Sequence, residues 1–209
     1  MKNTLAYVCA IAGMTLAAPQ VQAESLVDGS ADAGKTKSVT CAACHGPAGI
    51  SVNPLWPNLA GQGAPYIVAQ LKAFKEGTRK NPLMTSQAMM LSEQDMADLA
   101  VYFESLPGPA QAVADPDLVG KGEALFRGGE VSKQVAACMA CHGPNGSGNP
   151  AAAYPALKGQ HAQYTAKQLR DYASGERTSD GKTRIMREIA GKLSDDEIVA
   201  LASYVQGLK

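Results

Sequence analysis

A short cysteine motif occurs twice in this chain and constrains its structure more than any other feature. In each copy two cysteines stand three positions apart and a histidine follows directly: Cys41, Cys44 and His45, then Cys138, Cys141 and His142. The second copy lies 97 positions after the first, and Gly-Pro follows both. Except for Cys9, these are all the cysteines of the 209-residue chain. Two sites of the same kind are therefore expected.

The similarity between the two halves continues beyond the motif. Several residues recur 98 positions apart: Pro57 and Pro155, Gln62 and Gln160, Tyr66 and Tyr164, Gln70 and Gln168, Gly77 and Gly175. Such repetition indicates two copies of one structural unit. A stretch rich in Pro and Gly follows Leu106 and interrupts the chain between the copies. We expect one domain at 24–108, a linker at 109–116 and a second domain at 117–209.

Both halves show the spacing of helices. Side chains after each repeated tyrosine recur at i, i+4 and i+7, as in Ile67, Leu71 and Phe74. Later helices are predicted to begin at Ser92 and Ser194, the second with a capping-box pattern. A further helix precedes each motif, most clearly at 120–126, where glycines would allow another helix to come close. No alternating strand pattern occurs, so the predicted fold is all-α, with two domains of about 90 residues each.

The N-terminus has the order of a secretory signal peptide. A basic start with Lys2 is followed by an apolar run and then by small residues before Ala23, where we place the cleavage. Residues 1–23 are therefore predicted to be removed, with an uncleaved anchor as the alternative. The run is shorter than the roughly 20 apolar residues of a membrane span. Export predicts a periplasmic protein, and Cys9 would leave with the signal.

Cys-x-x-Cys-His is the attachment motif of haem c, in which two thiols bind the haem and the histidine becomes an axial ligand of the iron. We therefore predict two covalently attached haem c groups, held by Cys41 and Cys44 and by Cys138 and Cys141. Only 5% of the residues are aromatic, so a large apolar cofactor would also enlarge two small cores. A thiol redox motif, a zinc site and structural disulfides are the alternatives.

Each iron of an electron carrier usually needs a second axial ligand. His45 and His142 occupy one position each, and the third histidine, His161, has no counterpart in the first half. Methionine is the other common ligand. Met186 stands seven residues before Leu193, where the last helix approaches, and the same offset before Leu91 selects Met84.

Other residues near these positions receive different predictions. Met89, Met90 and Met96 are expected to be packing residues, with Met89 or Met90 as the replacement for Met84. His161 is expected at the surface or between the domains. The repeated tyrosines, Tyr66 and Tyr164, fit either a haem crevice or a core, and the sequence does not separate the two.

With these motifs and spacings the chain resembles the dihaem cytochrome c4 family. The resemblance covers nearly all of the mature sequence and implies tandem class I cytochrome c domains with their haems close together. It also implies periplasmic, loosely membrane-attached carriers that pass electrons toward terminal oxidases. In similar cytochromes a proline carbonyl accepts a hydrogen bond from the proximal histidine, which makes Pro57 and Pro155 the candidates here. The second half departs by four extra residues between Gly175 and Met186.

The predicted function is outer-sphere electron transfer between components of a respiratory chain, with membrane-bound redox complexes as partners. A haem subunit of a membrane oxidoreductase is the first alternative, and a dihaem peroxidase-type enzyme is the second. The mature chain has a formal charge of −1 before haem is counted, so nucleic acid is not an expected partner. No small-molecule substrate is expected either.

Overall fold

The computed structural model describes residues 25–209, so the predicted signal peptide and its cleavage site lie outside the described residues. Regular structure in this part of the chain consists of ten α-helices and three short 3₁₀ helices, without a strand. The all-α prediction is therefore confirmed. No helix within 25–209 is both long and apolar enough to cross a membrane.

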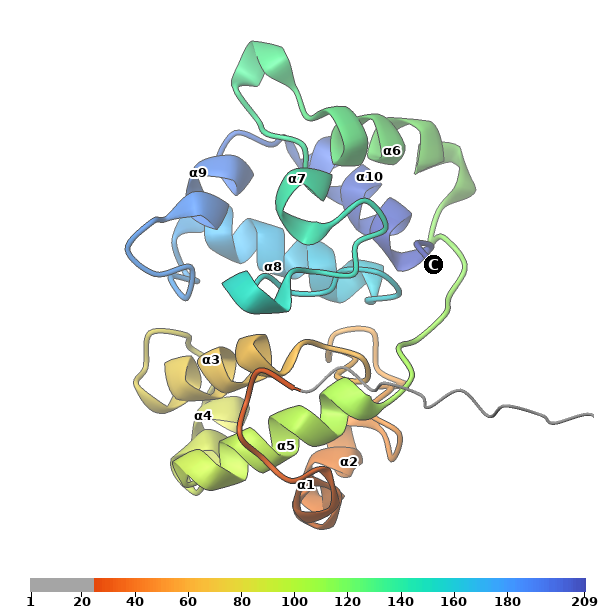
Figure 1. Cartoon of the computed structure of the whole chain (residues 1–209). Helices are drawn as coiled ribbons and strands as arrows, with labels where there is room; N and C mark the ends of the chain where they lie inside the picture. The colour runs from red at the N-terminus through yellow and green to blue at the C-terminus, as the bar shows by residue number, and fades with distance from the viewer. Residues whose placement is uncertain (1–24) are drawn as a thin grey trace, which may run out of the picture.

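The first half contains five helices, shown from red to yellow-green in Figure 1. They are α1 (Ala31–Lys37), α2 (Val39–His45), α3 (Ala64–Lys75), α4 (Pro82–Met89) and α5 (Glu93–Ser105). The cysteine motif ends α2, and the repeated tyrosine, Tyr66, lies in the first turn of α3. Helix α5 packs against both α1 and α3.

The second half repeats this order. It contains α6 (Val119–Gly128), α7 (Met139–His142), α8 (Ala162–Ser174), α9 (Ile185–Ala190) and α10 (Asp195–Gln206), with 3₁₀ helices η1 (Pro116–Leu118), η2 (Val131–Lys133) and η3 (Pro150–Ala152) between them. Helix α10 packs against α6 and α8, as α5 does against α1 and α3. Each half thus contains three packed helices, α1, α3 and α5 in the first and α6, α8 and α10 in the second, together with its own cysteine motif.

The last helix of each half begins with a capping box. The Ser194 hydroxyl accepts from the Glu197 N–H, and the Glu197 carboxylate accepts from the Ser194 N–H. This confirms the sequence prediction. Ser92 and Asp95 form the same arrangement at the start of α5, where the sequence indicated only the position of the start.

Glycine permits the closest helix contacts. A Cβ atom on Gly122 of α6 would lie 2.4 Å from the backbone oxygen of Ala200 in α10. Gly34 of α1 meets α5 in the same way, at Asp98. The close approach expected around 120–126 is confirmed at Gly122, whereas Gly120 faces open space.

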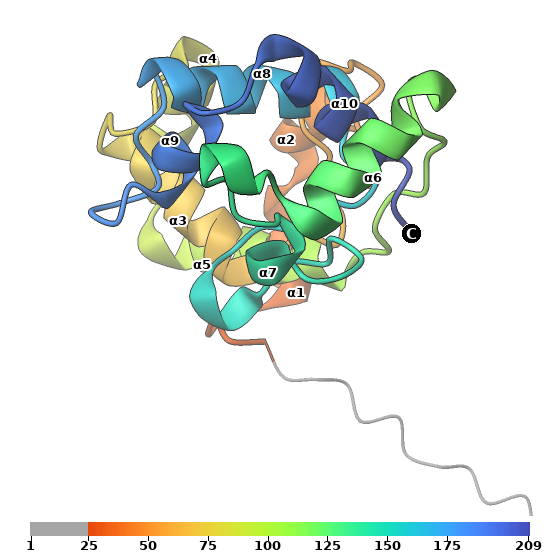
Figure 2. The ribbon, with the colours of Figure 1, turned by 90° about the horizontal axis from the view of Figure 1, so that it is seen from above.

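The halves stack on one another, with α3 and α8 on either side of the boundary (Figure 1). In the view from above the second half lies in front of the first, whose helices remain visible between and around it (Figure 2). Between α5 and η1 the chain runs along one side of the molecule. This connection is bonded to α10, because the Asp115 N–H donates to Ser203 Oγ at 2.7 Å and Gln206 Nε2 donates to the Ala112 oxygen at 2.9 Å.

Candidate functional site

A cavity of about 610 Å³ extends through both halves and brings most of the predicted ligands together. The cysteine, histidine and methionine residues on its walls are Cys44, His45, Met84, Cys138, Cys141, His142 and Met186. Cys41 is not among the lining residues and packs against the core of the first half. One continuous space therefore faces both motifs.

Each motif histidine is buried and oriented by a proline carbonyl. The Nδ1 atom of His45 lies 2.9 Å from the Pro57 oxygen, and that of His142 lies 2.9 Å from the Pro155 oxygen. Because a carbonyl only accepts, Nδ1 carries the proton in both rings and Nε2 is left with its lone pair. Burial lowers the pKa of both histidines, which favours the neutral ring that a metal requires.

The first cysteine of each motif, Cys41 or Cys138, lacks the lowered pKa of a reactive thiolate. None of the four motif cysteines forms a disulfide. Burial raises the pKa of the Cys138 thiol to about 11 and also raises that of Cys41, whereas redox-active cysteines have a lowered pKa. Within residues 25–209 no group of three or more His, Cys, Asp or Glu side chains could hold a metal ion. The raised pKa values of Cys41 and Cys138 disfavour the thiol-redox alternative.

The two methionines selected by the repeat occupy equivalent places in the first turns of α4 and α9. Asn81 caps α4, and its Oδ1 accepts from the Met84 N–H at 3.0 Å. At α9 the residue before the helix is instead Arg184, in the left-handed conformation with φ 54°. The longer loop of the second half thus delivers Met186 through a different helix start.

The other methionines of the first half lie away from the cavity walls. Met96 is only 1% exposed and belongs to the core, whereas Met89 and Met90 are 57% and 72% exposed. His161 also lies outside the lining, and its Nε2 donates to the Ser51 oxygen of the first half at 2.9 Å. It is an interdomain residue in this structure.

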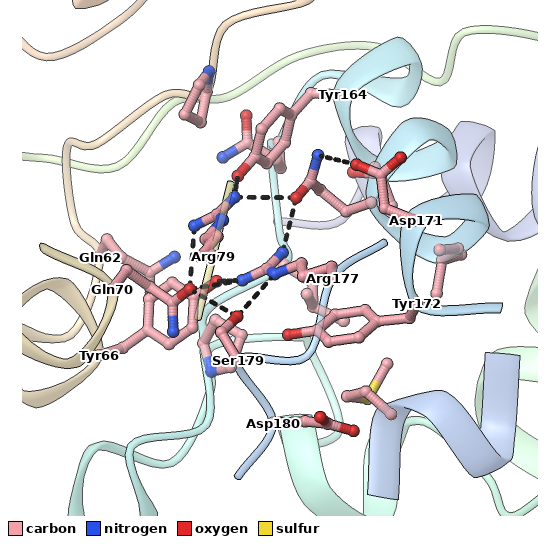
Figure 3. A pocket seen from close by; sticks show the side chains of 18 of the residues that line it. Gln62, Tyr66, Gln70, Arg79, Tyr164, Asp171, Tyr172, Arg177, Ser179 and Asp180 are labelled. Carbon is pink, nitrogen blue, oxygen red and sulfur yellow. Dashed lines mark hydrogen bonds between the residues drawn. The ribbon is translucent and has the colours of Figure 1, made fainter. Parts of the chain in front are cut away.

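Two buried arginines cross the boundary between the halves (Figure 3). Arg79 donates to the Tyr164 hydroxyl at 2.7 Å, and Arg177 donates to the Tyr66 hydroxyl at 2.8 Å. Each also bonds both repeated glutamines of the cluster, Gln70 and Gln168. Each guanidinium further lies 4.5 Å above an aromatic ring of its own half. Tyr66 and Tyr164, which the sequence could not assign to a haem crevice or to a core, therefore line the cavity and join the halves.

These arginines bring positive charge into the cavity wall without an acidic partner. Arg79 is 8% and Arg177 5% exposed, and no carboxylate of the described residues pairs with either. Burial raises the pKa of Tyr66, but the charges of Arg177 and then Arg79 outweigh this effect and hold it below the ordinary value. The sequence analysis missed both arginines, although they recur at the same interval of 98.

The residues present fit haem c. Each half supplies two thiols, a neutral histidine with a free Nε2 and a methionine around one apolar cavity. Haem also carries two carboxylates, and the buried guanidiniums offer the counter-charge that such groups need. Among the described residues, no carboxylate side chain balances the charges of Arg79 and Arg177.

Comparison with known proteins agrees with this geometry. The family model Cytochrome c matches the chain twice, at residues 31–107 and 121–209. A cytochrome c4 of Azotobacter vinelandii is 51% identical over 86% of this chain and 90% of its own length, and that of Pseudomonas aeruginosa is 49% identical over 86% and 89%. The crystal structure of reduced recombinant cytochrome c4 from Pseudomonas stutzeri matches with a TM-score of 0.84 and 48% identity, over 87% of this chain and all of that one.

The fold and the site define a cytochrome c with two tandem domains. Within that class, the chain belongs to the cytochrome c4 family. It carries two covalently bound haem c groups and is an electron carrier with redox partners, not an enzyme. The resemblance inferred from the motifs is confirmed, and the peroxidase alternative is set aside.

Proposed function

We propose that His45 and Met84 are the axial ligands of the first haem iron, and that His142 and Met186 are those of the second. Cys41 and Cys44 attach the first haem, and Cys138 and Cys141 attach the second. The carrying observation is that both histidines and both methionines face one continuous cavity. The domain limits that accompany this assignment are 24–108 and 117–209, with the linker at 109–116.

Haem c supplies a one-electron redox couple when it is bound. The protein residues keep the surroundings of that couple constant. Pro57 and Pro155 fix the orientation of the histidine rings through the 2.9 Å bonds, so the ligands need not rearrange when the charge changes. Arg79 and Arg177, which are buried in the cavity wall, would supply the counter-charge for haem carboxylates. Because one cavity is lined by residues of both domains, the two haems would be held in the same space, which supports electron exchange between them.

The proposed setting is the periplasmic end of a respiratory chain. A leader with signal-peptide order at 1–23 supports export, and the carrier function supports exchange with membrane-bound redox complexes. We place the acceptor among terminal oxidases, with peripheral association at the membrane. Neither nucleic acid nor a small-molecule substrate has a role in this proposal.

Two experiments test the setting. Osmotic shock of cells that produce the protein should release it with periplasmic markers and without residues 1–23, as read by intact mass. Chemically reduced protein added to membranes of the source cells should then be oxidised with matching oxygen uptake. Membranes that oxidise an artificial donor but leave the reduced protein untouched would refute the oxidase proposal.

A further inference from the structure

Two glutamines form matching bridges between the domains. Gln160 of the second domain accepts from the Asn58 N–H at 2.9 Å and donates to the Asn58 oxygen at 3.0 Å. Gln62 of the first domain accepts from the Ala156 N–H at 2.8 Å and donates to the Ala156 oxygen at 3.0 Å. Both glutamines are 8% exposed. Each glutamine side chain therefore forms two hydrogen bonds with the backbone of one residue in the opposite domain.

Asn58 and Ala156, the residues bound by the glutamines, each follow the proline that orients the proximal histidine. The Asn58 N–H and the Pro57 carbonyl belong to the same peptide group, and the His45 ring bonds that carbonyl. In the second domain one peptide group likewise joins the Pro155 carbonyl and the Ala156 N–H. A chain of two hydrogen bonds thus runs from each proximal histidine, through one peptide group, to the glutamine of the other domain.

The glutamine amides are held in place from their own side as well. The Gln62 oxygen accepts from the Gly63 N–H, and the Gln160 oxygen accepts from the His161 N–H, each at 3.0 Å. Both donors lie at the start of a helix that follows the glutamine, α3 or α8. Two donors therefore fix each amide oxygen, and no rotation is needed for it to reach the opposite peptide.

Hydrogen bonds in such a chain strengthen one another. An acceptor at a peptide N–H shifts electron density onto the carbonyl oxygen of the same group, which then accepts more strongly. A stronger bond from Nδ1–H makes the imidazole a better electron donor to a metal at Nε2. A better donor stabilises the ferric state, so the reduction potential falls.

We propose that each glutamine is a positioning residue that lowers the potential of the haem in the opposite domain: Gln160 acts on the first haem and Gln62 on the second. This inference rests on the axial ligation proposed above. The tuning depends on docking, since each domain lacks its glutamine partner when the two separate. Domain docking and haem potential are thereby coupled in this chain.

The test uses Gln62→Leu and Gln160→Leu in the full haem-loaded protein. NMR of the reduced form follows the Nδ1–H signals of His45 and His142, and NMR-monitored redox titration gives a midpoint for each haem. Gln62→Leu should move the His142 signal and raise the midpoint of the second haem, with His45 and the first haem unchanged. Gln160→Leu should give the mirror-image result.

Thr178→Val is the matched control, because it removes a bond between the domains, from Thr178 to the Thr78 oxygen at 2.9 Å, that touches neither proline peptide. It should leave both midpoints in place. Equal shifts of both haems in either glutamine variant, or a shift only in the variant's own domain, would overturn the proposal. Failure of the ligation itself would be visible separately, as missing histidine and methionine ligand signals in the unsubstituted protein.

Discussion

Methionine usually fills irregular core space, and the residues of the first half show what distinguishes a ligand candidate. Met96 is buried in the core, and Met89 and Met90 point to solvent, whereas Met84 lines the cavity in the first turn of α4. The internal repeat had selected the same residue by its offset from the last helix. Repetition within the chain thus supplied information that composition lacks.

Replacement of Met84 by Ala should lower the midpoint potential of the first haem, because a thioether ligand favours the reduced iron. The second haem should keep its potential. Met89→Ala is the matched control, since its side chain is exposed and off the cavity wall. Redox titration of the three proteins measures the effect, and an unchanged pair of midpoints in Met84→Ala would reject this ligand.

Arg79 and Arg177 could not be predicted in the same way. A charged residue usually lies at the surface, and nothing in the sequence near either one specifies burial. Their role depends on the other half of the chain, 85 and 111 positions away, where the tyrosine partners lie. Only the folded arrangement brings these groups together.

At the scale of helices, close packing of α1 on α5 and of α6 on α10 builds the frame that carries each motif. The start of each last helix and the glycines of α6 were readable from local sequence, because caps and helix crossings depend on few residues. The start of α9 could not be predicted from local sequence, since the second half has a longer loop and a left-handed residue, Arg184, at that point. Loop geometry of this kind is set by contacts distant in the sequence.

Gly122→Ala should lower the free energy of unfolding by about 1–3 kcal/mol, because the new methyl group would meet the backbone of α10. Backbone atoms cannot move aside as a side-chain end can. Gly120→Ala lies in the same helix with open space around it and should be neutral or slightly stabilising. Chemical denaturation of both variants measures the difference, and equal effects would contradict the crossing geometry.

Asp98 of α5 joins this helix to α1 through two hydrogen bonds. Asp98 accepts from Lys37 at 2.5 Å and from the Ser30 N–H at 2.8 Å. The Lys37 bond, then Ser30, lowers its pKa from 3.8 to about 2. A carboxyl whose pKa is lowered by folding contributes stability at pH values above its pKa in the unfolded chain. That contribution is lost as the pH falls toward its pKa in the folded protein.

Asp98→Asn should therefore unfold more easily than the unsubstituted protein at pH 7, by an amount that stays constant down to about pH 5. The difference should shrink between pH 3.8 and about 2. Denaturation curves at several pH values provide the measurement. A difference independent of pH over that range would show that the charge of Asp98 has no part in the joint.

At the scale of the molecule, the repeat predicted two domains and two haem sites, but it did not predict how the domains meet. Gln62, Tyr66 and Gln70 recur in the second half, yet recurrence alone does not distinguish a core position from an interface. The structure shows that the repeated residues form reciprocal hydrogen bonds across the boundary, Arg79 with Tyr164 and Arg177 with Tyr66. These matching bonds join the two domains into one unit.

Arg177→Met should lower the haem potentials, because a buried positive charge in the cavity wall favours the reduced form of a haem held there. Arg177→Lys keeps the charge but loses the forked hydrogen bonds to Tyr66 and Gln70, so its potentials should change less. Redox titration compares the two variants. Larger shifts in the lysine variant would show that geometry, and not charge, is the main contribution.

The measurement that tests the central claim most directly combines a haem count with the spectrum of the reduced protein under carbon monoxide. Pyridine haemochrome analysis should give two haems c per chain, and the EPR spectrum of the oxidised form should be entirely low-spin. Carbon monoxide should leave the reduced spectrum unchanged, since the proposed ligands Met84 and Met186 would occupy the position on each iron that carbon monoxide needs. A high-spin fraction, or a haem that binds carbon monoxide, would contradict a carrier with two closed sites.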